Sequence, residues 1–288
     1  MVTKPTKDKA QKPAKDKAKR PAKTKAAVTP TLPVEPVFIT PEPQRDTYAV
    51  AFCIIATPKD VTPDRLQLCL SSLPDNAQVC ILLNSEGPVE YLSEIDVDVR
   101  EKQTIRSREW KFPKGTFDFA KARNICQDMA TKEWAFWIDC DELLCAAQHD
   151  GIEYAVASHG GGVGGFNCGQ ASMTRYTQLA SGKDPEYINI KQLRLYRLGC
   201  GFTWEGYAHE QIAHSIRGAG YSVVDTSITV VHNGYSQTDA ELIARLNRNA
   251  DLIGKWLHEK PKDHPLAAYY KGVYVRELSA IQNLEKPQ

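Results

Sequence analysis

Three carboxylates follow directly on a short apolar segment of this chain, and their spacing suits divalent-cation chemistry. The segment Trp134–Ile138 predicts a buried strand in a sheet covered on both faces, and Asp139, Asp141 and Glu142 come at its exit. In open α/β sheets, ligands gather at the carboxyl ends of such strands. Asp139 and Asp141 point to the same side if the strand continues, and a turn at Cys140 lets them converge. Two hard oxygen ligands suit Mg²⁺ or Mn²⁺ bridging a diphosphate, whereas the simpler alternative is a polar turn after a strand.

The segments that precede these carboxylates predict a parallel sheet. Tyr48–Ala56 and Gln78–Asn84 are apolar and typical of buried strands. Between them, Thr62 and Pro63 provide a cap and a first-turn proline for an amphipathic helix. A strand, a helix and a strand at this spacing form a βαβ unit, and therefore a parallel sheet.

The second half of the chain has a different pattern. A helix capped by Asp118 leads into the strand before the carboxylates, and the pattern changes after Asp150. Gly160–Gly165 predicts a flexible loop, and Ile188–Arg197 and Ser222–His232 are typical of strands. The sheet is therefore expected to be mixed.

The C-terminal part predicts helices. Thr238 and Glu241 form a capping box that opens a long helix, and Pro261 stops it. A last helix is expected from about Pro265. The fold class predicted from these elements is α/β, a single mixed sheet flanked by helices with a C-terminal helical appendage.

The N-terminal segment differs from the rest in charge and composition. Residues 1–27 carry a net charge of +8 and the remainder a net charge of −7, although the whole chain carries only +1. A Lys-Pro-Ala-Lys pattern repeats there with a period of eight, and residues 28–46 contain five prolines. We expect residues 1–46 to be a disordered tail and linker, which either tethers the protein to a polyanion such as DNA or only solubilises it.

The eight cysteines show no Cys-x-x-Cys pair and lie mostly in apolar segments. Neither a signal peptide nor a mitochondrial presequence is indicated, and no apolar stretch is long enough to span a bilayer. We therefore expect reduced, buried thiols in a cytoplasmic protein.

Four motif blocks occur in an order and at a spacing that resemble a known family. The resemblance is to family 2 glycosyltransferases of the GT-A fold, the fold of nucleotide-diphospho-sugar transferases. Within that family it is to the branch that includes lipopolysaccharide-core glucosyltransferases and peptide S-glycosyltransferases, and it covers about residues 50–270. The blocks are Trp110…Phe117–Asn124, Trp134…Asp139–Glu142, Leu193–Arg197 with Trp204–Glu210, and His232–Tyr235.

The resemblance implies roles on the donor side of the site. Asp139 is expected near the nucleoside ribose and the metal, Asp141 as a direct ligand of Mn²⁺ or Mg²⁺, and His232 as a third ligand. Arg123 suits the donor phosphates through its planar fork of donors, or else forms a salt bridge that holds its helix to the sheet. Thr57 resembles the rim of the nucleoside site.

The second strand ends at Asn84, where the family often carries an aspartate that reads the base. UDP is therefore only the default nucleotide.

Glu210 is the candidate general base, and His209 is the alternative base or an acceptor-orienting group. An inverting displacement needs the base on the face opposite the leaving diphosphate.

Trp204 and Tyr207 are expected to line the acceptor side, with core packing as the alternative.

Two other motifs fail on their context. Gly160–Gly165 satisfies G-x-G-x-x-G, but no strand precedes it and no helix follows. His209-Glu-Gln-Ile-Ala-His214 resembles a zinc protease motif, but its histidines are five residues apart. That motif needs them at i and i+4, on one face of a helix.

The sequence thus predicts a metal-dependent, inverting glycosyltransferase with residues 47–236 as the GT-A domain and residues 237–288 as helices packing on it. The donor is expected to be a nucleotide-diphosphate sugar, by default UDP-glucose. The acceptor is expected to be a hydroxymethylated base in DNA or a lipopolysaccharide-type glycan. The alternatives are a nucleotidyltransferase and a catalytically inactive GT-A binding module.

Overall fold

The strands form one mixed sheet, as the sequence predicts. The structure is a computed structural model that describes residues 38–39, 48–57, 62–84, 90–112, 117–173, 187–232 and 238–285. Among these residues nine strands form one sheet in the order β1-β4-β3-β2-β5-β8-β7-β9-β6. They are β1 (Phe38–Ile39), β2 (Val50–Ala56), β3 (Gln78–Leu83), β4 (Thr104–Glu109), β5 (Trp134–Trp137), β6 (Glu142–Leu144), β7 (Val163–Met173), β8 (Tyr187–Arg197) and β9 (Ser222–His232).

The direction of each strand follows from its connection. β2, β3, β4 and β5 pair in parallel, because helical crossovers join them. β8 then pairs antiparallel with both β5 and β7, and β6 pairs antiparallel with β9. The carboxyl ends of β2, β3 and β5 consequently lie at one edge of the sheet, where the predicted donor residues follow them.

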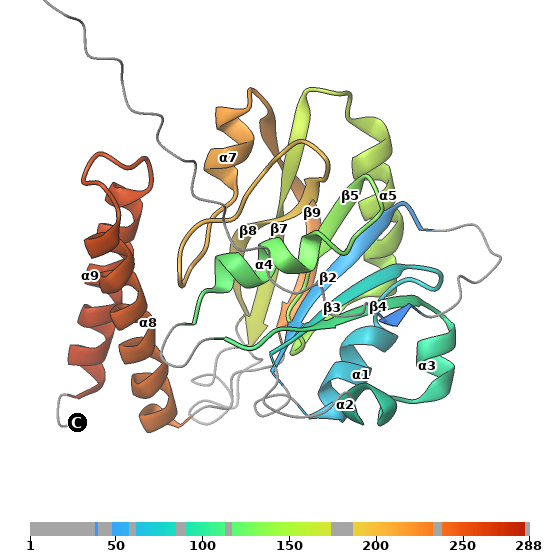
Figure 1. The fold of residues 1–288 in the computed structure, drawn as a ribbon, viewed down its shortest axis with the longest axis horizontal. Coiled ribbons are helices and arrows are strands. Elements are labelled where there is room, and N and C mark those ends of the chain that lie inside the picture. Colours follow the sequence, from blue (N-terminus) through green and yellow to red (C-terminus); the bar gives the residue numbers. More distant parts are fainter. Residues whose placement is uncertain are drawn as a thin grey trace, which may run out of the picture. The chain divides into compact units, whose positions relative to one another are not determined.

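Helices cover both faces of the sheet (Figure 1). Side chains of β2 alternate between two buried clusters: Phe52 and Ile54 belong to the cluster that includes Leu66 and Ile152, and Cys53 belongs to the cluster that includes Cys126 and Ile216. This alternation follows from the two-residue period of a strand. Among the described residues, the helices between β2 and β9 are α1 (Pro63–Ser71), α2 (Glu90–Ser93), α3 (Val97–Glu101), α4 (Phe119–Gln127), the 3-10 turn η1 (Ala146–Gln148), α5 (His149–Ser158) and α7 (Ala213–Gly218).

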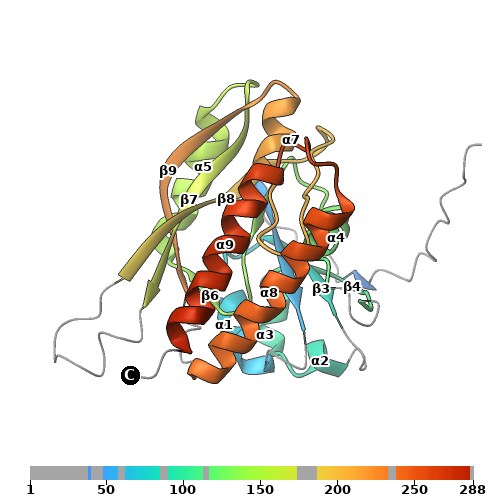
Figure 2. The ribbon, with the colours of Figure 1, turned by 90° about the vertical axis from the view of Figure 1, so that its left-hand side faces the viewer.

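The C-terminal helices α8 (Asp239–Glu259) and α9 (Ala267–Leu284) lie side by side (Figures 1 and 2). The predicted capping box is present, since the Thr238 hydroxyl accepts from the Glu241 amide and the Glu241 carboxylate accepts from the Thr238 amide. Trp256 and Tyr270 form the centre of a third buried cluster, which also contains Ala208. The helices therefore pack on the loop that carries the candidate base.

Two local predictions are wrong. Phe38–Ile39 belongs to the segment expected to be a linker, but it pairs antiparallel with β4. The expected flexible loop Gly160–Gly165 instead leads into β7, where Gly164 lies beneath α7. A Cβ on Gly164 would come within 2.8 Å of Ile216 and Tyr221, so only glycine lets the helix pack this closely.

Several predictions lie outside the described residues or remain untested. The basic repeats of residues 1–27 and the segment Asn233–Tyr235 lie outside them. The boundaries at residues 46 and 236 remain predictions; by internal contacts the chain divides into Met1–Val34 and Glu35–Gln288. Eight cysteines are free thiols and most are buried. Within the described part of the chain, no helix is long and apolar enough to cross a membrane.

Candidate active site

The predicted metal turn lies at the carboxyl edge of the parallel strands. β5 pairs with β2 in the register Cys53↔Trp137, so Asp139 emerges beside the end of β2. The turn closes when the Glu142 amide donates to the Asp139 carbonyl oxygen at 3.0 Å. The thiol of Cys140, in the middle of the turn, donates to the carbonyl oxygen of Ile55 in β2 at 3.2 Å. The turn is thus held against the sheet, and the side chains of Asp139 and Asp141 remain partly exposed.

Asp141 and His232 lie together although they are far apart in the sequence. The distance from His232 Nε2 to Asp141 Oδ2 is 3.2 Å. β6 and β9 produce this contact, because their antiparallel register sets Glu142 opposite His232. Burial acts against the charge of both side chains, but their mutual hydrogen bond and charge attraction, together with neighbouring groups, outweigh it. The pKa of His232 is therefore raised and the pKa of Asp141 lowered.

The donor set suits a hard or borderline divalent cation that keeps outside ligands. Among the described residues, no three His, Cys, Asp or Glu side chains are grouped closely enough to hold a metal ion by themselves. Asp141 and His232 offer one oxygen and one nitrogen at the same place. Mg²⁺ and Mn²⁺ sites commonly use one or two protein carboxylates together with substrate phosphates and water. The residues present therefore fit such a cation when a diphosphate supplies further ligands.

Asp139 faces the other way, toward Arg123. Its Oδ1 lies 3.6 Å from Arg123 Nη2, and 44% of its side chain is exposed. Partial burial and the neighbouring carboxylates of Glu142 and Asp141 raise the pKa of Asp139 above its usual range, while Arg123 acts in the opposite direction. Asp139 is therefore adjacent to Asp141 but engaged with a different partner.

Arg123 joins the two predicted halves of the site. Its Nε donates to Glu210 Oε1, and both side chains are at least nine-tenths buried. Its guanidinium lies over the ring of Trp137 at 3.9 Å and 5.3 Å from the ring of Trp204. Burial lowers the pKa of Arg123, but Glu210 and Asp139 more than offset this and raise it, so the group stays charged.

The loop that carries Glu210 has an unusual backbone and is anchored by α9. His209 has φ +53° and Gly206 has φ +109°. The hydroxyl of Tyr270 contacts the carbonyl oxygens of Glu205 and His209 at 3.0 and 3.1 Å. His209 Nε2 lies 2.8 Å from Glu277 Oε1. His209 is therefore oriented by α9, whereas Glu210 is oriented by α4.

The two aromatic residues expected on the acceptor side differ in exposure. Trp204 is 4% exposed and makes edge contacts with Trp137 and Tyr196. Its core-packing alternative therefore applies, and no face of its ring is offered to an acceptor. Tyr207 is partly exposed, donates its hydroxyl to Glu259 and lies beneath Lys255.

The two predicted nucleoside residues meet at the ends of β2 and β3. Asn84 Nδ2 donates to Thr57 Oγ1 at 3.3 Å, and the Phe112 amide donates to Asn84 Oδ1 at 3.5 Å. Both side chains are partly exposed. The structure therefore brings Thr57 and Asn84 to the same edge as Asp139.

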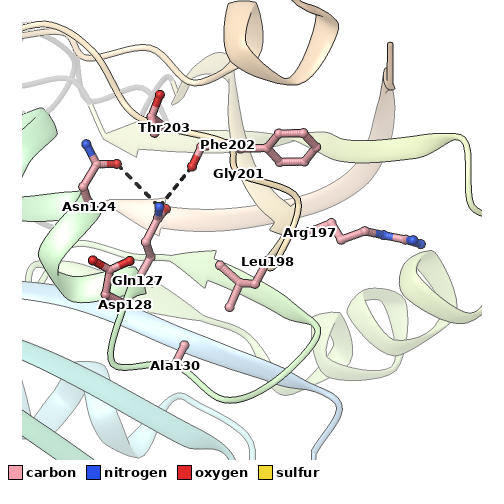
Figure 3. A pocket seen from close by; sticks show the side chains of 10 residues that line it. Asn124, Gln127, Asp128, Ala130, Arg197, Leu198, Gly201, Phe202 and Thr203 are labelled. Carbon is pink, nitrogen blue, oxygen red and sulfur yellow. Dashed lines mark hydrogen bonds between the residues drawn. The ribbon is translucent and has the colours of Figure 1, made fainter. Parts of the chain in front are cut away.

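A cavity of about 540 Å³ lies elsewhere, at the amino end of β5 (Figure 3). Its lining includes Gln127, Asp128 and Arg197, and the register Trp134↔Arg197 places Arg197 beside the start of β5. Gln127 Nε2 donates to the Phe202 carbonyl oxygen at 3.2 Å. Since the carboxylates follow the opposite end of β5, this cavity is separate from the candidate active site.

The sequence analysis names Glu142 among the three carboxylates but gives it no role, and it assigns no role to Arg194 or Glu277. Glu142 accepts a two-pronged ion pair from Arg194, and both side chains are fully buried. Glu277 of α9 holds His209. Glu142 belongs to the same acidic motif as Asp139, so the sequence does show a carboxylate at this position. Nothing in the spacing of Arg194 or Glu277, however, indicates that they pair with Glu142 and His209.

Comparison by sequence relates this chain to glycosyltransferases, the class that its motifs predict. Two such relatives are the SPbeta prophage-derived glycosyltransferase SunS of Bacillus subtilis and the glycosyltransferase SunS of Bacillus phage SPbeta. Each is 26% identical over 222 residues, which is 77% of this chain and 48% of the relative. The chain thus spans about half the length of these curated relatives. No protein-family model matches it.

Solved structures that match this chain include glycosyltransferases and a putative glucose-1-phosphate thymidylyltransferase from Bacillus anthracis. The mannosyltransferase PcManGT from Pyrobaculum calidifontis, in complex with GDP-Man and Mn²⁺, has a TM-score of 0.48 and 13% identity over 88% of this chain and 80% of that one. S. aureus TarS 1–349 in complex with UDP-GlcNAc has a TM-score of 0.43 and 10% identity over 80% of this chain and 71% of that one. Both scores are below 0.5, so they do not bear on the assignment of residues.

Proposed function

We propose that this protein transfers a sugar from a nucleotide-diphosphate sugar to a nucleophilic acceptor, with Mn²⁺ or Mg²⁺ bound at Asp141 and His232. The contact between these two side chains carries the proposal, because it unites two motif blocks of a chain related to glycosyltransferases. When bound, the cation neutralises charge that develops on the departing diphosphate. In this proposal Thr57 and Asn84, which contact each other at the same edge, bind the nucleoside.

The acceptor is activated on the opposite side of Arg123 in this proposal. Glu210 serves as the general base, and its ion pair with Arg123 sets the direction of its carboxylate. Arg123 also contacts Asp139, so one guanidinium connects the donor side to the acceptor side. A base that faces the leaving group across the sugar would invert the anomeric centre. His209 is the alternative base, with Glu277 orienting its ring.

Calorimetric titration with UDP, with and without Mn²⁺, tests the donor site. Asp141→Asn removes a ligand charge, and Asp225→Asn is the matched control because Asp225 is exposed and pairs with Lys191. We expect Mn²⁺-dependent binding by the wild type and the control and its loss in Asp141→Asn. GDP, CDP and dTDP follow as probes of the base. Absence of metal-dependent binding to all four nucleotides would refute the proposal.

The products separate the proposed reaction from its rivals. A glycosyltransferase releases the nucleoside diphosphate, whereas a nucleotidyltransferase leaves the nucleotide on its product. An inactive binding module binds nucleotide without turnover. UDP-glucose is the first donor to assay, with hydroxymethylated DNA and a lipopolysaccharide-type glycan as acceptors. A salt series of DNA binding, comparing the full chain with a variant whose lysines in residues 1–27 are replaced by glutamine, tests the tether.

A further inference from the structure

The turn that carries Asp139 and Asp141 rests on a carboxylate that contacts no solvent. Glu142 has 0% exposure, and both of its oxygens are occupied. Oε2 accepts from the Asp139 amide at 2.9 Å, and Oε1 accepts from Gln170 Nε2 at 2.9 Å. Arg194 donates to Oε2 at 2.5 Å and to Oε1 at 2.6 Å. The carboxylate thus ties the backbone of the turn to β7 and β8.

Glu142 is placed to control the predicted ligands from both sides. Its amide donates to the Asp139 carbonyl oxygen while its side chain accepts from the Asp139 amide, so two hydrogen bonds close the same turn. In β6 it is the register partner of His232. One residue therefore fixes where Asp139 and Asp141 leave the sheet and where His232 meets them.

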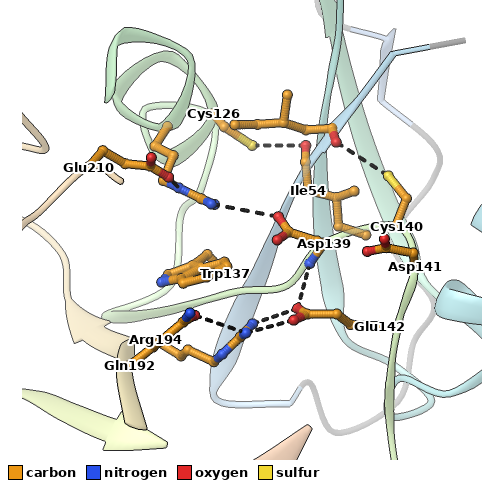
Figure 4. Close-up of polar contacts among 12 residues, drawn as sticks. Ile54, Cys126, Trp137, Asp139, Cys140, Asp141, Glu142, Gln192, Arg194 and Glu210 are labelled. Atoms are coloured by element: carbon orange, nitrogen blue, oxygen red, sulfur yellow. Dashed lines mark hydrogen bonds and ion pairs between the residues drawn. The ribbon is translucent and has the colours of Figure 1, made fainter. Parts of the chain in front are cut away.

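Arg194 extends this link to the acceptor side. Its guanidinium lies 4.0 Å from the ring of Trp137, the same ring that Arg123 contacts at 3.9 Å. In Figure 4, Trp137 lies between Arg194 and Glu210. The indole Nε1 donates to the carbonyl oxygen of Leu193 at 2.6 Å, which fixes the ring against β8. A shift of Arg194 would therefore move the Trp137 ring, and with it the Arg123 guanidinium that packs on the same ring.

A buried ion pair is a poor source of stability, because the desolvation of two charges offsets most of their attraction. An apolar pair of similar volume would fill the same space. Unlike an apolar pair, however, the Glu142–Arg194 pair supplies a hydrogen-bond acceptor: Glu142 accepts from the Asp139 amide.

We propose that Glu142 and Arg194 are positioning residues that hold the Asp139–Asp141 turn in the conformation required for metal and nucleotide binding. The claim about nucleotide binding rests on the proposed function and is tested by UDP binding. The claim that the pair orders the turn does not rest on it and is tested by hydrogen–deuterium exchange.

Hydrogen–deuterium exchange of the peptide that covers residues 138–145, in the full chain, measures the order of the turn. The variants are Arg194→Lys, which keeps the charge but loses the two-pronged geometry, and the double variant Glu142→Leu/Arg194→Met, which leaves no unpaired charge and no acceptor for the Asp139 amide. Lys191→Met is the matched control on β8, because Lys191 forms an exposed pair with Asp225 rather than with Glu142 or Asp139. Urea unfolding gives the global stability of each variant.

We expect exchange in this peptide to rise by about tenfold or more in both variants, beyond any change that global stability explains, and to remain at the wild-type rate in Lys191→Met. Mn²⁺-dependent UDP binding should weaken in the same variants. Unchanged exchange, or an increase spread evenly over all peptides, would overturn the positioning role. If the wild type binds no nucleotide, the proposed function fails, but the exchange data still decide whether the pair orders the turn.

Discussion

Gly206 offers the sharpest test of how α9 supports the site loop. A Cβ added at this position would lie 1.6 Å from the hydroxyl oxygen of Tyr270 and 2.6 Å from its Cζ. Gly206 also has φ +109°, a conformation that side-chain-bearing residues rarely adopt. Gly206→Ala therefore carries two separate costs, backbone strain and a steric clash with a fully buried ring.

The magnitude follows from these two costs. Strain at such a backbone position costs roughly 1–3 kcal/mol. Overpacking against a buried side chain costs roughly another 1–3 kcal/mol. We therefore expect Gly206→Ala to lower the free energy of unfolding by roughly 2–6 kcal/mol, a large part of the ~5–15 kcal/mol typical of native proteins.

Urea unfolding followed by circular dichroism measures this loss, and two further variants separate its causes. Gly199 has φ +75°, and a Cβ added there would meet no atom within 4 Å, so Gly199→Ala reports strain alone, about 1–2 kcal/mol. Tyr270→Phe removes the atom at 1.6 Å, so Gly206→Ala/Tyr270→Phe should lose less stability than the sum of the single variants. Equal costs at Gly206 and Gly199, or strict additivity with Tyr270→Phe, would refute the reasoning.

Three other changes have defined outcomes. Arg123→Met leaves the buried Glu210 unpaired and should cost about 3–5 kcal/mol in urea unfolding, most of it regained with Glu210→Leu; no recovery would contradict the pairing. The raised pKa of His232 means that its pair with Asp141 stabilises the fold below the unfolded pKa of 6.5 and loses this effect as pH rises through the folded value. Mn²⁺ binds only the neutral imidazole of His232, so the Mn²⁺ affinity measured by calorimetry should increase as pH rises through the folded pKa of His232. An affinity that does not change with pH would exclude His232 as a ligand. Thr238→Ala removes the α8 cap and should cost about 1 kcal/mol of unfolding free energy; an unchanged midpoint would count against the capping box.

The local elements were predictable because their causes are local. The apolar segments around Phe52 and Trp134 form strands, Asp118 accepts the hydrogen bond that caps α4, and Thr238 opens α8 as its spacing indicates. Each depends on neighbouring residues, so hydrophobic periodicity and capping chemistry suffice. The glycine-rich segment was misread because glycine also serves where a helix crosses closely, as Gly164 does beneath α7.

The sequence by itself determined which residue types could serve the proposed sugar transfer and at which strand ends they lie: Asp139 and Asp141 after β5, His232 at the end of β9. Only the tertiary structure decided their partners. Asp141 meets His232 because β6 and β9 pair, and Arg123 reaches Glu210 because α4 packs beneath the loop that α9 holds. These contacts join residues up to 91 positions apart, and the burial that makes such polar pairs necessary exists only once the chain has folded.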